Sequence, residues 1–310
     1  MDEHIGLLAN PALPLVYRGS KMFGVDERRR QPLNHLLASL SPGLLVDSAW
    51  LQAQGISRTS IHDYVKRGWL ERVAPRVYRR ATQNGTASTV RWDMAVMSAQ
   101  RIGTTPFHVG GVTALDLLGQ GHFARLGSAR LIHLYGSEGA APSWLGKLQT
   151  DATIRLHTRA MFADAALGVA WHRLDLGTGR LGVALASPDS TEIWDHFLRV
   201  AGAERAAIEM MEDVPDVVGF EHADMIFENL ATLRPKLLTS LLETCQSVRA
   251  KRLFLFFADR HDHGWIKHVD RSGINLGRGK RQLVPGGRLD PVYQITVPPT
   301  LLSRAGATTQ

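Results

Sequence analysis

The sequence predicts an α+β protein in which an N-terminal winged helix-turn-helix is followed by a mixed α/β C-terminal region. Residues 44–80 have the pattern of two short helices joined by a glycine turn and followed by a basic hairpin. The chain after residue 88 alternates helical stripes with short strand-like runs. At 310 residues, with 44% hydrophobic and 21% charged residues, it has room for several domains with real cores.

Residues 1–30 are expected to form a flexible N-terminal segment. They begin with the acidic Asp2 and Glu3 and contain Pro11 and Pro14, a pattern that does not fit a signal peptide. The basic run Arg28–Arg30 has two equal interpretations, a DNA-contacting arm or a solvated approach to the next helix.

Residues 31–82 are predicted to form the winged helix-turn-helix domain. Its first helix would begin at Pro32, a residue that the first helical turn tolerates. This helix would bury the apolar stripe Leu33, Leu36, Leu37 and Leu40. A second helix carrying Trp50 and Leu51 would follow, with Asp47 or Ser48 as its N-cap.

The next helix, residues 57–67, is expected to be the recognition helix. Ile61, Tyr64 and Val65 have the i, i+3, i+4 spacing of one buried face, and Ser57 suits the N-cap position. The opposite face is polar and cationic. Residues 69–73 and 76–79 then alternate apolar and charged side chains across Ala74-Pro75, which predicts a hairpin wing.

Positive charge is concentrated near this predicted domain. The chain has a net charge of +7, and residues 1–90 hold 12 Lys and Arg against 7 Asp and Glu. Such an excess favours binding to DNA, whose phosphates attract Lys and Arg, although a solvated basic surface without a partner would look the same.

We expect the recognition helix to enter the major groove and the wing to contact the DNA backbone. Arg58 could make a bidentate contact to guanine from the first turn, and His62 and Lys66 lie further along that face. Arg67 and Arg72 could instead form surface ion pairs with Asp63 and Glu71. The candidate DNA-binding residues are Ser57, Arg58, Thr59, Ser60, His62, Lys66, Arg67, Arg72, Arg76, Arg79 and Arg80.

Residues 83–186 are predicted to form an α/β middle region, after a polar linker at 81–88. Helices are expected from residue 88 or 89 to about 102 and over 112–118. The strands that we expect here are 130–135, 152–157, 169–174 and 181–186.

Residues 187–310 are predicted to form a helical and β C-terminal region. Helices are expected near 189–200, 201–212, 220–230 and 234–248. The run 252–258 is dense in aliphatic and aromatic residues and is predicted to be a buried strand. Further short strands are expected at 267–269, 274–276, 281–284 and 293–297.

Signals for catalysis or for a bound cofactor are weak. Cys245, the single cysteine, excludes an internal disulfide and suits a buried thiol in a reducing cytoplasm. No apolar run is long enough to span a membrane. The region around Gly277 and Lys280 lacks the spacing of a phosphate-binding P-loop, although Arg278, Lys280 and Arg281 could form a basic hairpin that contacts nucleic acid.

Two clusters of titratable residues are candidate sites. The group containing His261, His263 and His268 is the best metal candidate, but its polar turn favours a surface role, and no metal or cofactor is expected. The acidic residues Glu204, Glu209, Glu212 and Asp213 lie on or beside a helical segment that also carries Arg205, and they fit either a solvated surface or ion pairing along the helix. The sequence therefore favours a protein that is not an enzyme.

Four segments together resemble the AbiEi antitoxin family. Residues 68–73 with Val77-Tyr78 are similar to that family's wing, although Arg76 stands where the family usually has glycine. Residues 108–115 and 203–209 are similar to two further family segments. The helix and strand that close the family's pattern are matched by 237–242 and 251–255.

The resemblance implies an antitoxin of a bacterial type IV toxin–antitoxin system, acting in the cytoplasm. Its winged domain would bind double-stranded operator DNA and repress its own operon. Its C-terminal region would counter a nucleotidyltransferase-like toxin, with no direct contact implied. Because winged modules read short half-sites, we expect two copies on an operator, as a homodimer or bound cooperatively. The alternatives are a ligand-responsive transcriptional regulator and a metal-dependent nuclease.

Overall fold

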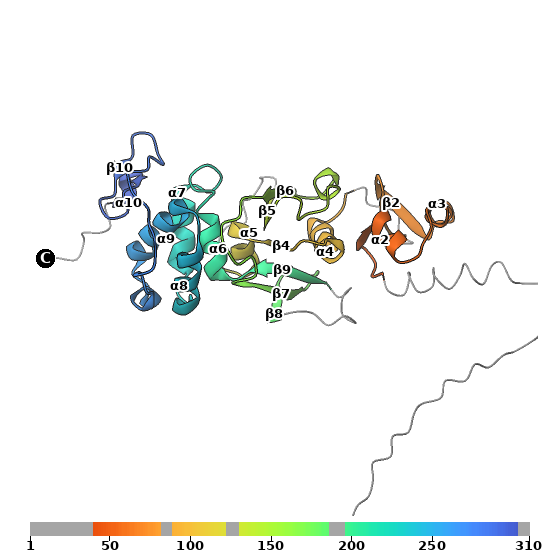
Figure 1. Ribbon diagram of the computed structural model, residues 1–310, viewed down its shortest axis with the longest axis horizontal. Helices are drawn as coiled ribbons and strands as arrows, with labels where there is room; N and C mark the ends of the chain where they lie inside the picture. Colours follow the sequence, from red (N-terminus) through yellow and green to blue (C-terminus); the bar gives the residue numbers. More distant parts are fainter. Residues whose placement is uncertain (1–39, 82–88, 122–129, 186–195, 303–310) are drawn as a thin grey trace, which may run out of the picture.

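The structure, a computed structural model, describes residues 40–81, 89–121, 130–185 and 196–302. The flexible segment predicted for residues 1–30 and most of the predicted first helix lie outside these ranges. Figure 1 shows an elongated molecule, with the small N-terminal module at one end, a mixed sheet in the middle and a layer of helices at the other end. The α+β fold class is therefore confirmed.

The N-terminal module has the winged helix-turn-helix layout that the sequence predicts. Its elements are β1 (Leu45–Asp47), α2 (Ser48–Ala53), α3 (Arg58–Lys66), β2 (Leu70–Ala74) and β3 (Val77–Arg80). The three strands pair in the order β1-β3-β2, and both pairings are antiparallel. Strands β2 and β3 thus form the predicted wing.

Local capping and burial explain why these helices form. An Asp47 carboxylate oxygen accepts a hydrogen bond from the Trp50 backbone N–H at 2.8 Å, so Asp47 is the N-cap of α2. Ile61 and Tyr64 turn inward from α3, and the Tyr64 ring lies 5.5 Å from the ring of Trp69 at the start of the wing. The wing and the helix therefore share one small core.

The winged module is held to the middle of the molecule by specific contacts. The Leu45 backbone N–H donates to the Ser98 hydroxyl of α4 (Trp92–Ile102) at 2.8 Å, in a buried position. The Trp144 indole N–H donates to the second oxygen of Asp47 at 3.2 Å. The hydrophobic core also continues from the module into the rest of the chain.

The middle of the molecule contains a six-stranded sheet in the order β6-β5-β4-β9-β7-β8. Its parallel pairs are β5 with β6 and β4 with β9, and the other neighbours are antiparallel. The strands are β4 (Phe107–Val109), β5 (Leu131–Gly136), β6 (Thr153–His157), β7 (Val169–Leu174), β8 (Leu181–Leu185) and β9 (Phe197–Ala201).

Strand β9 corrects the helix that was predicted over 189–200. Residues 186–195 are outside the described ranges, but residues 197–201 pair with β4 and β7. Phe197, Leu198 and Val200 are all buried, so the strand carries apolar residues on both faces. A strand buried in this way loses the alternation that identifies a strand in a sequence.

Helices cover one end of the sheet. They are α5 (Gly111–Leu117), α6 (Ala203–Met210), α7 (Phe220–Asn229), α8 (Pro235–Thr244) and α9 (Val248–His261). The helices predicted over 112–118, 201–212 and 220–230 are confirmed. The one predicted over 234–248 ends early, because Cys245 is extended and pairs with Phe162 in an isolated bridge.

The buried strand predicted over 252–258 is wrong, because these residues belong to α9. Ser247 caps this helix by accepting a hydrogen bond from the Ala250 backbone N–H at 3.1 Å. Phe254, Leu255 and Phe257 are fully or almost fully buried, and so are Lys251 and Arg252 on the same helix. Residues 253–258 are all apolar, so this run offers no periodicity that would separate a helix from a strand.

The C-terminal tail contains little regular structure. It comprises the 3₁₀ helix η3 (Gly264–His268), β10 (Arg288–Leu289), β11 (Thr296–Val297) and α10 (Pro299–Leu302). Of the predicted strands, 267–269 and 274–276 do not form, 281–284 has one isolated bridge at Arg281, and 293–297 forms in part.

The buried Arg252 guanidinium organises this tail. It donates to the backbone carbonyls of Leu276 and Gly279 at 2.8 and 2.6 Å, and to that of Gln294 at 3.3 Å. One side chain thus supplies hydrogen bonds to three carbonyls of this irregular segment, and the Gln294 carbonyl also accepts from the Arg281 backbone N–H at 2.9 Å. Within the part of the chain that the structure describes, no helix has both the length and the apolar character to cross a membrane.

Candidate functional site

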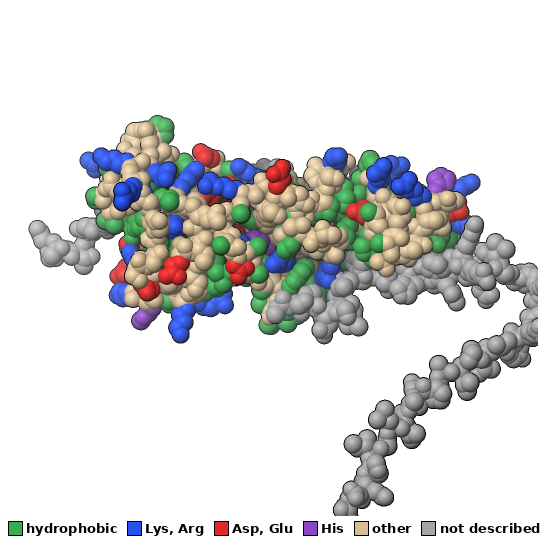
Figure 2. Space-filling view, viewed as in Figure 1, with side chains coloured by type: hydrophobic (Ala, Val, Ile, Leu, Met, Phe, Trp, Pro, Cys, Tyr) green, Lys and Arg blue, Asp and Glu red, His purple; other side chains and the backbone are tan. Residues whose placement is uncertain are grey.

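The outer face of α3 is polar and carries most of the module's predicted DNA-binding residues. Arg58, Thr59, His62, Lys66 and Arg67 are all exposed, while Ile61 and Tyr64 on the opposite face are buried. Figure 2 shows Lys and Arg side chains gathered over this end of the molecule, at the positions of β2 and α3. The face is available to a partner.

The Ser57 and Ser60 side chains form hydrogen bonds at the N-terminus of α3. The Ser57 hydroxyl oxygen accepts a hydrogen bond from the Ser60 backbone N–H at 3.1 Å and lies 2.9 Å from the Ser60 hydroxyl. Both hydroxyls are therefore occupied at the helix start. The Arg58 side chain reaches back to Gln52 of α2, donating at 3.3 Å, and is exposed, so it can exchange this contact for another acceptor.

The cations of the wing differ in how strongly the fold holds them. Arg79 makes two hydrogen bonds to Glu71, at 2.8 and 3.1 Å, and its side chain is only 13% exposed. Glu71 thus pairs with Arg79 and not with Arg72, the partner considered from the sequence. Arg72 is exposed and donates at 3.4 Å to the carbonyl of Ala74, while Arg80 is partly buried. The Arg67 guanidinium lies over the Trp69 ring, 5.3 Å from its centre.

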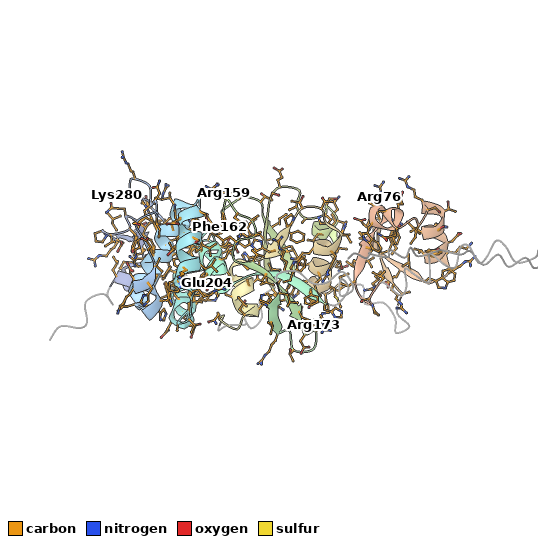
Figure 3. All side chains as sticks on the ribbon, turned by 60° about the horizontal axis from the view of Figure 1, so that its bottom comes forward. Arg76, Arg159, Phe162, Arg173, Glu204 and Lys280 are labelled. Carbon is orange, nitrogen blue, oxygen red and sulfur yellow. The ribbon has the colours of Figure 1, made fainter. Side chains whose placement is uncertain are left out.

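Arg76 occupies the tip of the wing in a conformation that usually requires glycine. Its φ is 65°, and with Pro75 it forms the two-residue connection between β2 and β3. Proline followed by a left-handed residue is typical of a type II turn, where glycine is preferred second. The wing turn is therefore retained without glycine, and an exposed cation sits at its tip (Figure 3).

Replacing Arg76 with glycine is expected to remove strain and charge together. The left-handed backbone costs a non-glycine residue about 1 kcal/mol, so Arg76→Gly should melt at a higher temperature than Arg76→Ala. If the wing contacts phosphates, both variants should bind DNA more weakly than the parent, by about 3- to 10-fold. Thermal melting and gel shifts test the two effects separately, and equal melting of both variants would contradict the strain.

A second group of polar side chains lies buried between the sheet and α6. The Glu209 carboxylate is completely buried, and its Oε1 accepts from Arg205 Nε and His108 Nε2, each at 2.8 Å. Its Oε2 accepts from the Gly111 backbone N–H at 3.2 Å. A Cβ on Gly110 would lie 2.1 Å from the same oxygen, so only glycine fits there. We call Glu209, Arg205, His108 and Gly111 the polar centre.

The solvated surface considered for the acidic residues of this helix is therefore wrong for most of them, whereas pairing along the helix is found between Arg205 and Glu209, at 2.8 Å. Glu204, Glu209 and Asp213 are 3%, 0% and 3% exposed. Glu204 accepts from both the backbone N–H and the side chain of Arg234, at 2.8 Å each. These partners lie far away in the sequence, so the composition of the helix alone could not reveal the burial.

The electrostatics of the polar centre favour a charged Glu209 beside a neutral histidine. Burial would raise the pKa of Glu209, but His108 and Arg205 together hold it below its ordinary value. Burial lowers the pKa of His108 more than Glu209 raises it. A neutral His108 that donates its Nε2–H to the carboxylate, with Arg205 supplying the compensating charge, is consistent with both shifts.

The other candidates from the sequence do not form a shared site. His261 Nε2 contacts Asp224 at 2.8 Å, and His263 Nε2 donates to the Phe227 carbonyl at 2.8 Å, so these nitrogens have separate partners. Lys280 lies at the opposite end of the molecule from Arg76 (Figure 3), so the basic hairpin is not part of the winged surface. Cys245 is buried, as predicted, and burial raises its pKa.

Comparison with known proteins identifies the family. Residues 29–126 match the family described as "Transcriptional regulator, AbiEi antitoxin N-terminal domain". Residues 129–298 match the one described as "Transcriptional regulator, AbiEi antitoxin, Type IV TA system". A search of curated proteins finds no match.

Among solved structures, the chain is similar to the crystal structure of the RV2827C protein from Mycobacterium tuberculosis. The two sequences are 14% identical, the match covers 85% of this chain and 88% of that one, and the TM-score is 0.49. The family matches cover most of the sequence, including both the winged module and the region with the polar centre. The chain therefore belongs to the AbiEi antitoxin family of transcriptional regulators from type IV toxin–antitoxin systems.

Proposed function

We propose that this protein is an autorepressing antitoxin that binds its operator DNA through α3 and the wing. The observation that carries the proposal is the exposed polar face of α3, with the exposed Arg72 and Arg76 of the wing in the same module. A helix of this kind fits the major groove, and adjacent cations suit the phosphate backbone. Membership of a family of regulators supports the same role.

Within this proposal the side chains have different tasks. Arg58 reads a base edge from the first turn of α3, and His62 and Lys66 follow along the exposed face. Arg72 and Arg76 contact phosphates. Arg79, which is paired with Glu71, positions the wing and contributes less charge to the DNA than the sequence suggests.

Two copies of the chain would occupy one operator, each reading a half-site. The remainder of the chain would counter a nucleotidyltransferase-like toxin by a route that needs no stable complex with it. We propose that it acts as a binding protein and not as an enzyme, in the bacterial cytoplasm, where the operator lies.

The double variant Arg58→Ala with Lys66→Ala tests the DNA contact. Loss of one base contact and one phosphate contact should weaken operator binding about 10- to 100-fold. Arg278→Ala with Lys280→Ala is a matched control, because it removes the same charge from exposed positions at the opposite end of the molecule. Gel shifts on the native promoter measure both. Equal weakening by the two variants, or an unchanged midpoint for the first, would contradict the proposal.

The same double variant separates repression from neutralisation. When it is co-expressed with the adjacent toxin gene from an unrelated promoter, cells should survive as they do with the parent protein. If rescue is lost at equal protein levels, the winged module is needed for neutralisation as well as for repression.

A ligand-responsive regulator is the second candidate, favoured by one cavity. Its volume is about 270 Å³, and its walls include Arg91, Trp92, Asp93, Arg130 and Asp151. Ligand pockets usually enclose about 300–1,000 Å³. Arg91 and Asp93 form an ion pair in which a guanidinium nitrogen lies 2.6 Å from a carboxylate oxygen. The cavity therefore offers little net charge to a ligand. Binding of a small molecule that releases operator DNA would support this alternative.

A further inference from the structure

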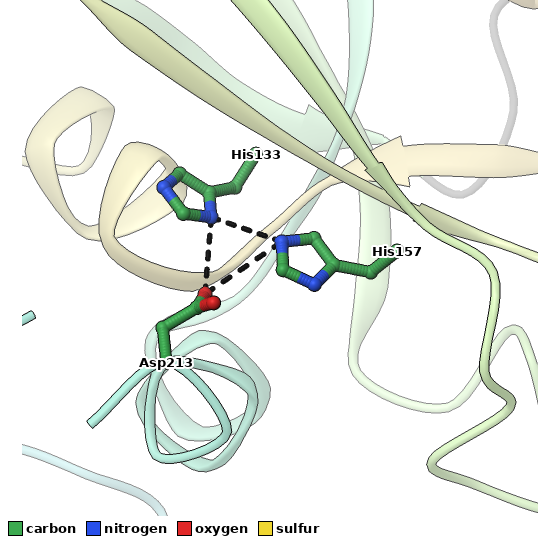
Figure 4. A group of neighbouring side chains, drawn as sticks. All are labelled: His133, His157 and Asp213. Carbon is green, nitrogen blue, oxygen red and sulfur yellow. Dashed lines mark hydrogen bonds and ion pairs between the residues drawn. The ribbon is translucent and has the colours of Figure 1, made fainter. Parts of the chain in front are cut away.

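Three potential metal ligands converge on one point between the sheet and α6. His133 comes from β5, His157 from the neighbouring parallel strand β6, and Asp213 from the residues that follow α6 (Figure 4). In the register of these strands, His133 pairs with Arg155 and Tyr135 pairs with His157. The two histidines therefore lie on the same face of the sheet, two positions apart.

The distances among the three donor atoms are close to those around a tetrahedral metal ion. His133 Nδ1 lies 3.0 Å from His157 Nε2 and 3.0 Å from Asp213 Oδ2, and His157 Nε2 lies 3.6 Å from the same oxygen. With metal–ligand bonds of 2.0–2.2 Å, tetrahedral ligands lie roughly 3.3–3.5 Å apart. Small movements of the rings would allow all three atoms to bind one ion.

Hydrogen bonds among the three side chains cannot all form at the same time. Each neutral imidazole carries a proton on only one nitrogen, and His133 Nδ1 is equally close to a carboxylate oxygen and to another ring nitrogen. A proton directed at Asp213 cannot also point fully at His157. A cation at the shared point would use one lone pair from each of the three residues.

The surroundings resemble the supporting shell of a metal site. The Tyr135 hydroxyl donates to Asp213 Oδ2 at 3.3 Å, and its ring stacks on His157 with centres 4.3 Å apart. The backbone N–H of His133 donates to the Thr113 hydroxyl at 2.9 Å. The Tyr135 contacts restrict the orientation of the Asp213 carboxylate and the His157 ring, as outer-shell partners do at metal sites.

Access and local charge are also compatible with a bound ion. The side chains of His133 and Asp213 are almost completely buried, whereas that of His157 is 15% exposed, which leaves an approach from one side. One opposing charge is present: Arg155, whose side chain is 48% exposed, lies 3.9 Å from the other Asp213 oxygen. This distance is too long for a hydrogen bond, and the exposed guanidinium can turn toward solvent.

We infer that His133, His157 and Asp213 bind a divalent transition-metal ion, for which zinc is the best fit. Two imidazoles and one carboxylate are a known zinc ligand set, which leaves the fourth tetrahedral position to water. The ion would fasten β5 and β6 to the end of α6. The site is separate from the winged module, so the inference stands independently of the proposed DNA binding.

Zinc titration of the full-length chain, after removal of any affinity tag and dialysis against EDTA, tests the inference. Isothermal titration should give one equivalent of zinc per chain. His157→Phe, which keeps a ring against Tyr135, and Asp213→Asn should each weaken binding by at least about 100-fold, because loss of a mere outer-shell partner costs 10- to 100-fold. Arg155→Ala should tighten it.

His263→Ala with His268→Ala is the matched control, because it removes two histidines from the other cluster that the sequence suggested. This control should bind zinc like the parent, and circular dichroism should show that all the variants are folded. Absence of stoichiometric zinc binding by the parent would overturn the inference, as would loss of binding in the control alone. Anaerobic uptake of Fe²⁺ without uptake of zinc would overturn the choice of metal.

Discussion

Glu209→Ala is expected to lower the free energy of unfolding by about 3–5 kcal/mol, the usual cost of removing one partner of a buried ion pair. Arg205 is only 5% exposed and would keep its charge without its carboxylate. His108 and the Gly111 backbone N–H would each lose the acceptor that they contact in the folded chain. Few single substitutions in this protein should be more damaging.

Urea denaturation measures this loss, and Asp216→Ala provides its control. Asp216 pairs with Arg249 at 3.6 Å, but its side chain is 76% exposed, so water already screens the pair. The control should unfold almost like the parent. Glu209→Gln should be intermediate, because an amide still accepts hydrogen bonds but carries no charge. If Glu209→Ala unfolded no more easily than the control, the polar centre would not be a stabilising ion pair.

Raising the salt concentration from 50 to 200 mM is expected to weaken operator binding by about 100- to 1,000-fold. Each phosphate contact contributes about −0.9 to the slope of log affinity against log salt, so four or five contacts give this range. The module supplies enough cations, since seven Lys and Arg lie between Arg58 and Arg80. Fluorescence anisotropy with labelled operator DNA gives the slope directly.

Single-charge variants then assign that slope to individual side chains. Arg72→Ala should reduce its magnitude by about 1 for each bound copy, as expected for one lost phosphate contact per chain. Lys280→Ala should leave it unchanged, because Lys280 lies at the far end of the molecule. A slope that responded equally to both variants would indicate attraction by overall charge and not a defined interface.

The winged module could be predicted because its signals are local. The spacing of Ile61 and Tyr64, the Ser57 cap and the Pro75-Arg76 turn each depend on residues within one or two turns of chain. Such patterns determine local structure wherever the segment packs. The exposed cations of α3 follow directly from that periodicity. The pairing of Arg79 with Glu71 does not, because it depends on the register of the hairpin.

The buried charges could not be predicted, because their partners are distant in the sequence. His108 and Glu209 are 101 residues apart, and the sequence segments that contain them resemble an ordinary loop and an ordinary polar helix. The helix α9 could not be predicted for a different reason, since residues 253–258 are all apolar and contain no polar position that would show a helical period. His133, His157 and Asp213 likewise come together only when strands and helix are assembled.

Asp47 makes hydrogen bonds to both the winged module and the sheet region, and this has a consequence for the spacing of operator half-sites. One carboxylate oxygen caps the N-terminus of α2, and the other accepts a hydrogen bond from the Trp144 indole N–H. The winged module is therefore held in a defined position against the sheet region. In a two-copy complex, the larger regions would then dictate the spacing and rotational phase of both α3 helices. Such a complex would bind only operators with the correct spacing between half-sites. About 5 extra base pairs would turn one half-site to the opposite side of the duplex, where the second α3 helix could not reach it.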